Sequence, residues 1–312
     1  MSFAFVFPGQ GSQSVGMLSD LSTVYPHVQS TFSQASEALG YDLWKLVSDG
    51  PEQDLNQTER TQPAMLAAGI AVWRCWQAAT DLSPAFLAGH SLGEYTALVA
   101  AGALEFADAI KLVELRGQFM QQAVPAGQGA MAAILGLEDD VVRAVCEQAS
   151  EFGVVEAVNF NSPGQVVIAG SADAVNPALE IAKEKGAKRA LLLPVSVPSH
   201  CALMKPAADN LAEALANITI NVPAIPVIHN ASVTSVDSAA EIKNLLAMQL
   251  YSPVRWVETV QWFANQGIDT VVEGGPGKVL AGLTKRIDKS LTGLSVFDEK
   301  TLQAAIQALG DN

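Results

Sequence analysis

Residues 89–93 read Gly-His-Ser-Leu-Gly, the pattern G-x-S-x-G, with Ser91 between two glycines. An apolar run at 84–88 precedes the pattern, and an apolar segment typical of a helix follows at 96–101. A strand, a sharp turn carrying a serine and a buried helix form a nucleophile elbow. The turn exposes the hydroxyl at a helix N-terminus, where unpaired N–H groups favour developing negative charge. The pattern therefore predicts that Ser91 attacks a carbonyl carbon.

The same serine has a simpler interpretation. Ser91 and Glu94 have the spacing of a capping box, S-x-x-E, in which the serine only begins a helix. A G-x-S-x-G match is also weak on its own, because its residue types are common. From the five residues alone, both interpretations stay open.

A serine nucleophile needs a base, because a neutral hydroxyl attacks carbonyls poorly. Of the four histidines, His27 lies on a polar helix face, and His90 adjoins the serine and is expected to support the turn. His229 ends an apolar strand and is expected to be buried and hydrogen-bonded. His200 stands at a loop-to-helix junction, and its position after Ser91 fits the order of α/β-hydrolases. No acidic residue between the two follows a convincing strand, so either a backbone carbonyl or an amide orients the imidazole, or the triad interpretation is wrong.

Two other segments carry possible binding groups. Residues 8–16 follow an apolar strand and contain G-x-G, but the third glycine of a dinucleotide fingerprint is displaced to Gly16. The loop is then either a flexible surface turn or a loop whose backbone N–H groups face a ligand. Arg116 lies in an apolar helical stretch before Gly117, where it is either a binding residue or an ordinary exposed or paired arginine.

Composition restricts the classes of partner and cofactor. The chain has 312 residues, 49% of them hydrophobic and 16% charged, and a net charge of −14. This acidic balance argues against nucleic acid as the main partner. No apolar run reaches the roughly 20 residues that span a bilayer, so no membrane partner is expected. The three cysteines include no C-x-x-C pair, which favours neither disulfides nor a metal site. Together with an N-terminus unlike a signal peptide, this predicts a cytoplasmic protein.

The order of elements predicts an α/β fold. Hydrophobic patterns predict strands at 2–7, 84–88, 129–136, 154–160, 165–170, 189–195, 225–229, 269–273 and 294–297. They predict helices at 24–39, 62–79, 96–101, 105–124, 138–150, 172–185, 199–216, 239–250, 254–266 and 301–309, and one ending at 287. The β-α-β-β-α-β order within 126–197 is that of a ferredoxin-like unit. We therefore expect an α/β-hydrolase-like parallel-sheet core, formed by 1–125 and 198–312, with an inserted ferredoxin-like small domain at 126–197.

Taken together, the motifs resemble a known family. The chain is similar throughout its length to the malonyl-CoA:acyl carrier protein transacylases of bacterial fatty acid synthesis, and more distantly to the acyltransferase domains of polyketide synthases. The segments that carry the resemblance stand in family order: Pro8-Gly9-Gln10-Gly11-Ser12-Gln13, Gly89-His90-Ser91-Leu92-Gly93-Glu94-Tyr95, Arg116, Asn161-Ser162-Pro163-Gly164-Gln165, Pro198-Ser199-His200 and Gly275-Pro276-Gly277.

The resemblance implies roles for individual residues. Ser91 would carry the malonyl group, and His200 would be the base that later protonates the departing thiolate. The backbone carbonyl of Gln249 would hold the second imidazole nitrogen, and the backbone amides of Gln10 and Leu92 would form an oxyanion hole. Arg116 would bind the free malonyl carboxylate, and Gln62 also falls in a matching motif of the substrate site.

The resemblance also implies the reaction. It implies a ping-pong transfer of malonyl from malonyl-CoA to the phosphopantetheine thiol of holo acyl carrier protein, with no metal or redox cofactor. Three alternatives remain at this point: a serine esterase or thioesterase, an acyltransferase for polyketide extender units, and a non-catalytic module that binds acyl groups or carrier proteins. An esterase is expected to have an acidic triad member and no buried arginine.

Overall fold

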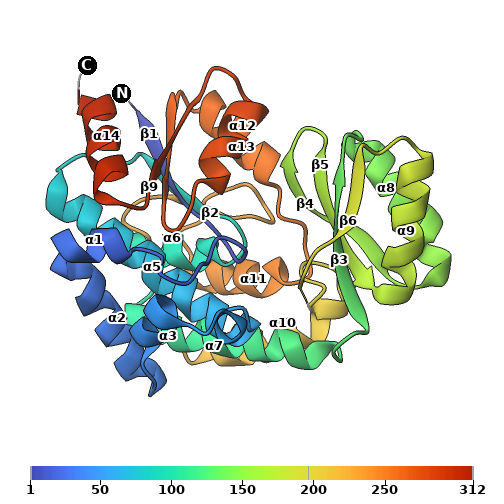
Figure 1. The fold of residues 1–312 in the computed structure, drawn as a ribbon, viewed down its shortest axis with the longest axis horizontal. Helices are drawn as coiled ribbons and strands as arrows, with labels where there is room; N and C mark the ends of the chain where they lie inside the picture. Colours follow the sequence, from blue (N-terminus) through green and yellow to red (C-terminus); the bar gives the residue numbers. More distant parts are fainter. Residues whose placement is uncertain (1, 196, 311–312) are drawn as a thin grey trace.

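The computed structural model describes residues 2–195 and 197–310, which form two separate sheets. The first sheet has five parallel strands in the order β7-β2-β1-β8-β9 (Figure 1). Its strands are β1 (Phe3–Phe7), β2 (Phe86–Gly89), β7 (Val227–Ile228), β8 (Thr270–Gly274) and β9 (Thr292–Val296). Since the strands are parallel, all their carboxyl ends lie at one edge, where α/β folds bind their ligands. The expected parallel sheet built from both ends of the chain is confirmed.

The alternation of side chains along β1 explains how both faces of this sheet are covered. Phe3, Phe5 and Phe7 point to one face and pack in the largest apolar cluster, which includes the two tryptophans Trp73 and Trp76 of helix α5 (Thr58–Ala79). The intervening residues of β1 point the other way, to α12 (Trp256–Asn265) and α13 (Val279–Ile287). A strand buried on both faces is typical of a parallel sheet between helical layers.

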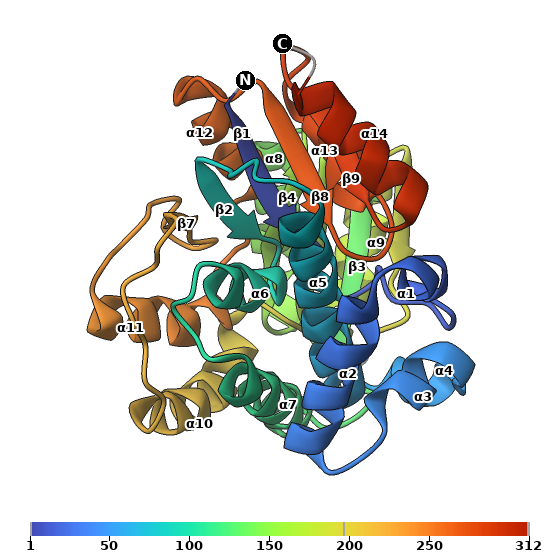
Figure 2. The ribbon, with the colours of Figure 1, turned by 90° about the vertical axis from the view of Figure 1, so that its left-hand side faces the viewer.

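Helices on the α5 side of the first sheet extend its apolar cluster. Helices α2, α5 and α7 lie side by side below the sheet in Figure 2. The other helices outside the second sheet are α1 (Ser19–Val24), α2 (Pro26–Leu39), α3 (Leu43–Asp49), α4 (Glu52–Leu55), α6 (Gly93–Ala100), α7 (Phe106–Ala123), α10 (Lys205–Ala216), α11 (Ala239–Gln249) and α14 (Glu299–Gly310). The sequence analysis did not predict the short helices α1, α3 and α4.

The second sheet is antiparallel and lies beside the first, on the right in Figure 1. Its strands are β3 (Gly129–Leu135), β4 (Val155–Ser162), β5 (Gln165–Ser171) and β6 (Arg189–Leu192), in the order β4-β5-β3-β6. Helices α8 (Asp139–Ala149) and α9 (Ala172–Glu184) complete the β-α-β-β-α-β order predicted for this part of the chain. Strand β4 extends through Ser162, two residues beyond its predicted end, so only residues 163 and 164 separate β4 from β5.

Backbone hydrogen bonds join the second sheet to the rest of the protein. Val254 donates to the carbonyl of Val158 and accepts from the N–H of Phe160, which adds a short parallel bridge to the edge strand β4. Helices α12 and α13 also contact β4 and lie between the two sheets. These contacts hold the second sheet against the carboxyl edge of the first. Among residues 2–195 and 197–310, no helix is long and apolar enough to cross a membrane.

Candidate active site

The predicted strand, turn and helix around Ser91 are present, and their glycines are required by close packing. Ser91 has a positive φ of 51° between the end of β2 and the start of α6. A Cβ on Gly89 would lie 1.9 Å from the backbone of Gly93, and a Cβ on Gly93 would lie 2.1 Å from the carbonyl oxygen of Phe7. Only glycine fits at either position. The capping-box interpretation is wrong, because Leu92 is the N-cap of α6 and no side chain caps the helix.

Ser91 and His200 form a hydrogen-bonded pair. The Oγ of Ser91 lies 2.8 Å from Nε2 of His200, and Nδ1 of His200 lies 2.7 Å from the backbone carbonyl oxygen of Gln249. Because a carbonyl only accepts, Nδ1 carries the hydrogen, and Nε2 of the neutral ring is free to accept the proton of the serine. The backbone N–H of His200 donates to Leu250 O at 2.9 Å. A backbone carbonyl therefore takes the place of the acidic residue that the sequence lacks.

The environment of His200 keeps its imidazole neutral. Burial, and after it the positive charge of Arg116, lower the pKa of His200 to about 3, although the hydrogen bond to Gln249 O acts in the opposite direction. Both main causes disfavour a second positive charge in the site. The pair is therefore in the protonation state that a general base requires at neutral pH.

Arg116 lies beside this pair and is almost fully buried, with 2% of its side chain exposed. Its Nη1 donates to Gln62 Oε1 at 2.7 Å, and its Nη2 donates to Gln249 Oε1 at 3.0 Å and to Ser91 Oγ at 3.3 Å. Its Nε is buried and has no hydrogen-bond partner. No acidic side chain lies within ion-pair distance of this guanidinium among the described residues. A buried arginine with unused donors beside a nucleophile is suited to binding a carboxylate.

Gln62 lies behind Arg116. Its side chain is fully buried, and its Nε2 contacts the sulfur of Met120 at 3.6 Å while its Oε1 accepts from the guanidinium. Gln62 is not among the residues that line the cavity above Ser91. Its described contacts thus fix the position of Arg116.

The loop after β1 approaches the elbow at the expected position. His90 donates its backbone N–H to Phe7 O at 3.0 Å, and a Cβ on Gly9 would lie 2.5 Å from His90 O. This close approach places Gln10 and Leu92 on the wall of the same cavity as Ser91. The interpretation of residues 8–16 as a loop that faces a ligand therefore agrees with its location.

The cavity above Ser91 has an empty volume of about 650 Å³. Its wall combines the polar groups described above with apolar side chains, among them Met120 of α7 and Met131 of β3. The lining residues are Gln10, Thr58, His90, Ser91, Leu92, Arg116, Met120, Met131, Asn159, Leu193, Val195, Val197, Ser199 and His200. An apolar cavity with a few convergent polar groups is typical of a binding site for an organic substrate.

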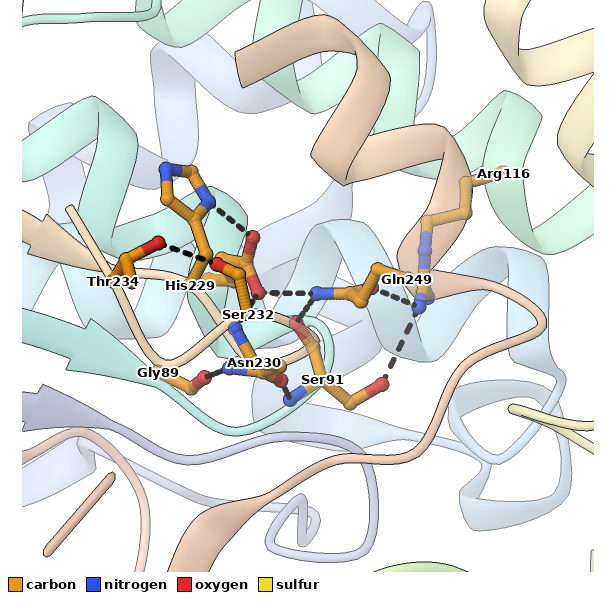
Figure 3. Close-up of polar contacts among 9 residues, drawn as sticks. Gly89, Ser91, Arg116, His229, Asn230, Ser232, Thr234 and Gln249 are labelled. Atoms are coloured by element: carbon orange, nitrogen blue, oxygen red, sulfur yellow. Dashed lines mark hydrogen bonds and ion pairs between the residues drawn. The ribbon is translucent and has the colours of Figure 1, made fainter. Parts of the chain in front are cut away.

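Behind the elbow lies a buried polar cluster that the sequence analysis missed. Asn230 accepts from the backbone N–H of Ser91 at 2.7 Å and donates through Nδ2 to Gly89 O at 2.6 Å. Gln249 donates through Nε2 to Ser91 O at 2.9 Å and to Glu94 Oε2 at 2.8 Å. Figure 3 shows the side chains of Asn230 and Gln249 converging on Ser91 from either side. Asn230 follows β7, and ligand-binding residues of parallel sheets gather at the carboxyl ends of strands. Its position after a predicted strand could therefore have identified it.

The other histidines have structural contacts. His90 Nε2 lies 2.8 Å from Asn161 Oδ1 on β4, which joins the elbow to the second sheet. His229 is buried as expected, with Nδ1 2.7 Å from Glu94 Oε1. His27 is half-buried in α2, whereas its polar helix face predicts an exposed side chain.

Neither a reactive cysteine nor a metal site competes with Ser91 in the described part of the chain. Burial raises the pKa of the thiols of Cys75, Cys146 and Cys201 to about 12, which keeps them protonated and unreactive. Residues 2–195 and 197–310 contain no group of three or more histidine, cysteine or acidic side chains that could hold a metal ion.

Comparisons with known proteins agree with a site for acyl groups. The acyl transferase domain family matches residues 4–297. The malonyl CoA-acyl carrier protein transacylase of Escherichia coli K12 is 57% identical over 305 residues, which cover 98% of this chain and 99% of the relative. An acyl carrier protein S-malonyltransferase of Vibrio cholerae has a similar structure, with a TM-score of 0.96, 62% identity and coverage of 98% and 100%. A malonyl-transacylase solved in complex with a type II PKS acyl-carrier protein has a TM-score of 0.97 and 54% identity, and all of both chains is covered.

Proposed function

Because the chain belongs to the acyl transferase domain family, among its malonyl CoA-acyl carrier protein transacylases, we propose that it transfers malonyl to acyl carrier protein. The group comes from malonyl-CoA and goes to the phosphopantetheine thiol of the carrier in fatty acid biosynthesis. The observation that carries the proposal is the Ser91–His200 pair at 2.8 Å with the buried, unneutralised guanidinium of Arg116 beside it. A serine–histidine pair suits acyl transfer, and the guanidinium selects an acyl group that ends in a carboxylate.

In the first half of the reaction, Ser91 Oγ attacks the thioester carbonyl while Nε2 of His200 takes the hydroxyl proton. The carbonyl oxygen becomes an oxyanion, which the backbone N–H groups of Gln10 and Leu92 stabilise; one such donor is worth about 3 kcal/mol. The C–S bond then breaks, and His200 returns the proton to the CoA thiolate. The product is a malonyl ester on Ser91.

In the second half, the carrier thiol replaces CoA in the cavity. His200 takes the thiol proton as the sulfur attacks the ester carbonyl, and the same two N–H groups hold the new oxyanion. The C–O bond to Ser91 breaks, and His200 returns the proton to its hydroxyl. One histidine thus acts as base and acid in both halves.

Arg116 binds the malonyl carboxylate through the edge of its guanidinium that carries Nε and Nη2. Its Nε has no hydrogen-bond partner, and its Nη2 donates to Gln249 Oε1 at 3.0 Å and makes a longer contact of 3.3 Å with Ser91 Oγ. A carboxylate accepts both hydrogens of such an edge in a bidentate pair, which a lysine cannot reproduce. Gln62 serves the substrate site by fixing the opposite edge of the guanidinium.

Transfer rather than hydrolysis follows from what lines the cavity. The side chains Met120, Met131, Leu193 and Val195 form an apolar wall that fits a pantetheine arm and disfavours water beside the acyl serine. The esterase hypothesis expected an acidic triad member and no buried arginine. His200 instead contacts a backbone carbonyl, and Arg116 is buried.

Intact-mass measurement tests this proposal. After incubation with malonyl-CoA, the protein is expected to gain one malonyl group, which addition of holo acyl carrier protein removes. Ser91→Ala should gain none, whereas Ser30→Ala, the same change at an exposed serine of α2 outside the site, should gain it as the wild type does. Absence of the adduct from the wild type, or its presence in Ser91→Ala, would refute the proposal.

A second function is favoured by one comparison. The similar malonyl-transacylase was solved with a carrier protein of a type II polyketide synthase. We propose that the same site can also supply malonyl extender units to such a carrier. Rates of transfer to a fatty-acid carrier and to a type II polyketide carrier, measured side by side, decide this; transfer to only the former excludes the second function.

Three finer sequence predictions belong to this proposal. The strand order β4-β5-β3-β6 supports describing 126–197 as a ferredoxin-like small domain, inserted into a hydrolase-like core of 1–125 and 198–312. The reaction steps given above need no metal or redox cofactor. A cytoplasmic location stays a prediction from the cysteine content.

A further inference from the structure

Glu94 is a buried carboxylate that the transfer reaction, as described, does not use. It lies in the first turn of α6, only 1% exposed, and it is not among the residues that line the cavity. Its Oε1 lies 2.7 Å from Nδ1 of His229. Its Oε2 accepts from the backbone N–H of Asn230 at 2.9 Å and from Nε2 of Gln249 at 2.8 Å. Two of these three partners also hold the backbone of Ser91.

Gln249 connects Glu94 to each reacting group. Its Nε2 donates to Glu94 and to Ser91 O, and its Oε1 accepts from Arg116 Nη2. Its backbone carbonyl accepts from His200 Nδ1. A single residue thus contacts the nucleophile, the base and the guanidinium at the same time (Figure 3 shows its contacts with Ser91 and Arg116).

The orientation of the Gln249 amide depends on the carboxylate. With the amide turned by 180°, Oε1 would face the negative charge of Glu94, and the NH₂ group would face the N–H donors of Arg116. Both contacts would be repulsive, and both would leave buried groups without partners, which is costly in a dry site. Burial lowers the pKa of Arg116, and the negative charge of Glu94 acts in the opposite direction.

We propose that Glu94 is a positioning residue for malonyl transfer, acting through Gln249 on Arg116 and His200. The proposal rests on the function proposed above. The carboxylate fixes the Gln249 amide so that its oxygen faces the guanidinium while the Gln249 backbone faces the imidazole. Glu94 touches no reacting atom itself.

The substitution Glu94→Gln tests this with almost no change in volume. A glutamine replaces one carboxylate oxygen by an NH₂ group and removes the negative charge, so Asn230 and Gln249 lose their charged acceptor and Nδ1 of His229 faces a changed partner. Displacements of about 1 Å in a site of this kind lower rates by up to about a hundredfold. We therefore expect kcat for malonyl transfer to fall between about tenfold and about a hundredfold. We also expect the preference for malonyl over acetyl to fall, because Arg116 loses its fixed partner.

A double-mutant cycle separates positioning from a general loss of structure. Gln249→Ala removes the connecting side chain but keeps the backbone carbonyl that His200 needs. If Glu94 acts through Gln249, then Glu94→Gln made in the Gln249→Ala protein should change kcat by no more than about twofold. Glu273→Gln is the matched control: Glu273 is an equally buried carboxylate on β8 with no contact to the site. Its kcat should equal that of the wild type.

Each outcome decides for or against the proposal. A wild-type kcat in Glu94→Gln, or the same loss of kcat with and without the Gln249 side chain, overturns it. A loss confined to the protein that retains Gln249 supports it. Should Glu94→Gln not fold, Glu94→Asp, which keeps the charge but is shorter by one methylene group, enters the same cycle with the same criteria. Failure of the wild type to transfer malonyl would instead refute the proposed function.

Discussion

Ser91 and His200 are separated by 109 residues, and at the point where their side chains meet at 2.8 Å both have a positive φ, 51° and 68°. Residues other than glycine rarely adopt this conformation, and each such residue costs about 1–3 kcal/mol. Asn230 Oδ1 accepts from the N–H of Ser91, and Gln249 Nε2 donates to its carbonyl oxygen. The backbone N–H of His200 donates to Leu250 O. The surrounding structure therefore maintains a strained backbone that directs Oγ at Nε2.

The first prediction concerns this strain. Ser91→Gly and Ser91→Ala both remove the hydroxyl, but only glycine adopts the positive φ without steric cost. We expect both variants to be inactive and Ser91→Gly to be more stable than Ser91→Ala by about 1 kcal/mol. Urea unfolding of the two proteins measures the difference. Equal stability, or a more stable alanine variant, would mean that the turn carries no strain.

Arg116 is expected to determine which acyl group is accepted. Arg116→Ala removes the bidentate partner of the malonyl carboxylate, so kcat/KM for malonyl-CoA should fall by about a hundredfold or more. The activity with acetyl-CoA should fall less or rise, because acetyl has no carboxylate to bind. Parallel assays with the two thioesters measure the change in preference. An unchanged preference would remove Arg116 from the substrate site.

The pH dependence of transfer should change when the positive charge of Arg116 is removed. Burial and this guanidinium lower the pKa of His200 to about 3, so the free enzyme should keep its base down to pH values near 3. In Arg116→Ala one of the two causes is gone, so the pKa of His200 rises and kcat/KM is lost at a higher pH on acidification. The pH profile of kcat/KM for acetyl-CoA, which both proteins can be given, measures this shift.

A matched control is Arg74→Ala, since Arg74 contacts Thr31 and Gln34 far from the site. Its acid limb should coincide with that of the wild type. Coincidence of the Arg116→Ala profile with these two would show that the guanidinium does not act on His200.

The reacting residues could be predicted from the sequence more completely than the residues that hold them in place. Ser91 and His200 were recognisable because a serine between two glycines in a strand–turn–helix pattern, followed later by a histidine, is the order of the nucleophile and base in α/β-hydrolases. The role of Gln249 came only from resemblance, because its contact with His200 is made by a backbone carbonyl that any residue possesses. Glu94 was missed because its spacing from Ser91 also fits a capping box, and its partners lie more than 130 residues further along the chain.

The local sequence pattern also predicts the wrong backbone conformation at His200. The sequence favoured a helix from residue 199, whereas a short 3₁₀ turn, Ala202–Met204, follows His200 and the helix α10 begins at Lys205. Tertiary contacts explain the difference: the hydrogen bond from His200 N to Leu250 O holds a positive φ that no helix permits. Such contacts between distant segments are invisible to hydrophobic periodicity.

The last prediction concerns Glu273, whose charge should make the stability of the whole protein depend on pH. Burial raises the pKa of this carboxyl from 4.5 to about 7, although backbone N–H groups at the start of α13 act in the opposite direction, and its Oε1 has no partner. Between these two pH values the folded protein binds a proton that the unfolded chain has released, so stability falls as the pH rises. The loss should be about 3 kcal/mol and complete above pH 7. Glu273→Gln cannot titrate, so its free energy of unfolding relative to wild type should increase by this amount between pH 4.5 and 7. Urea unfolding at several pH values measures both proteins, and a constant difference between them would show that Glu273 is charged throughout.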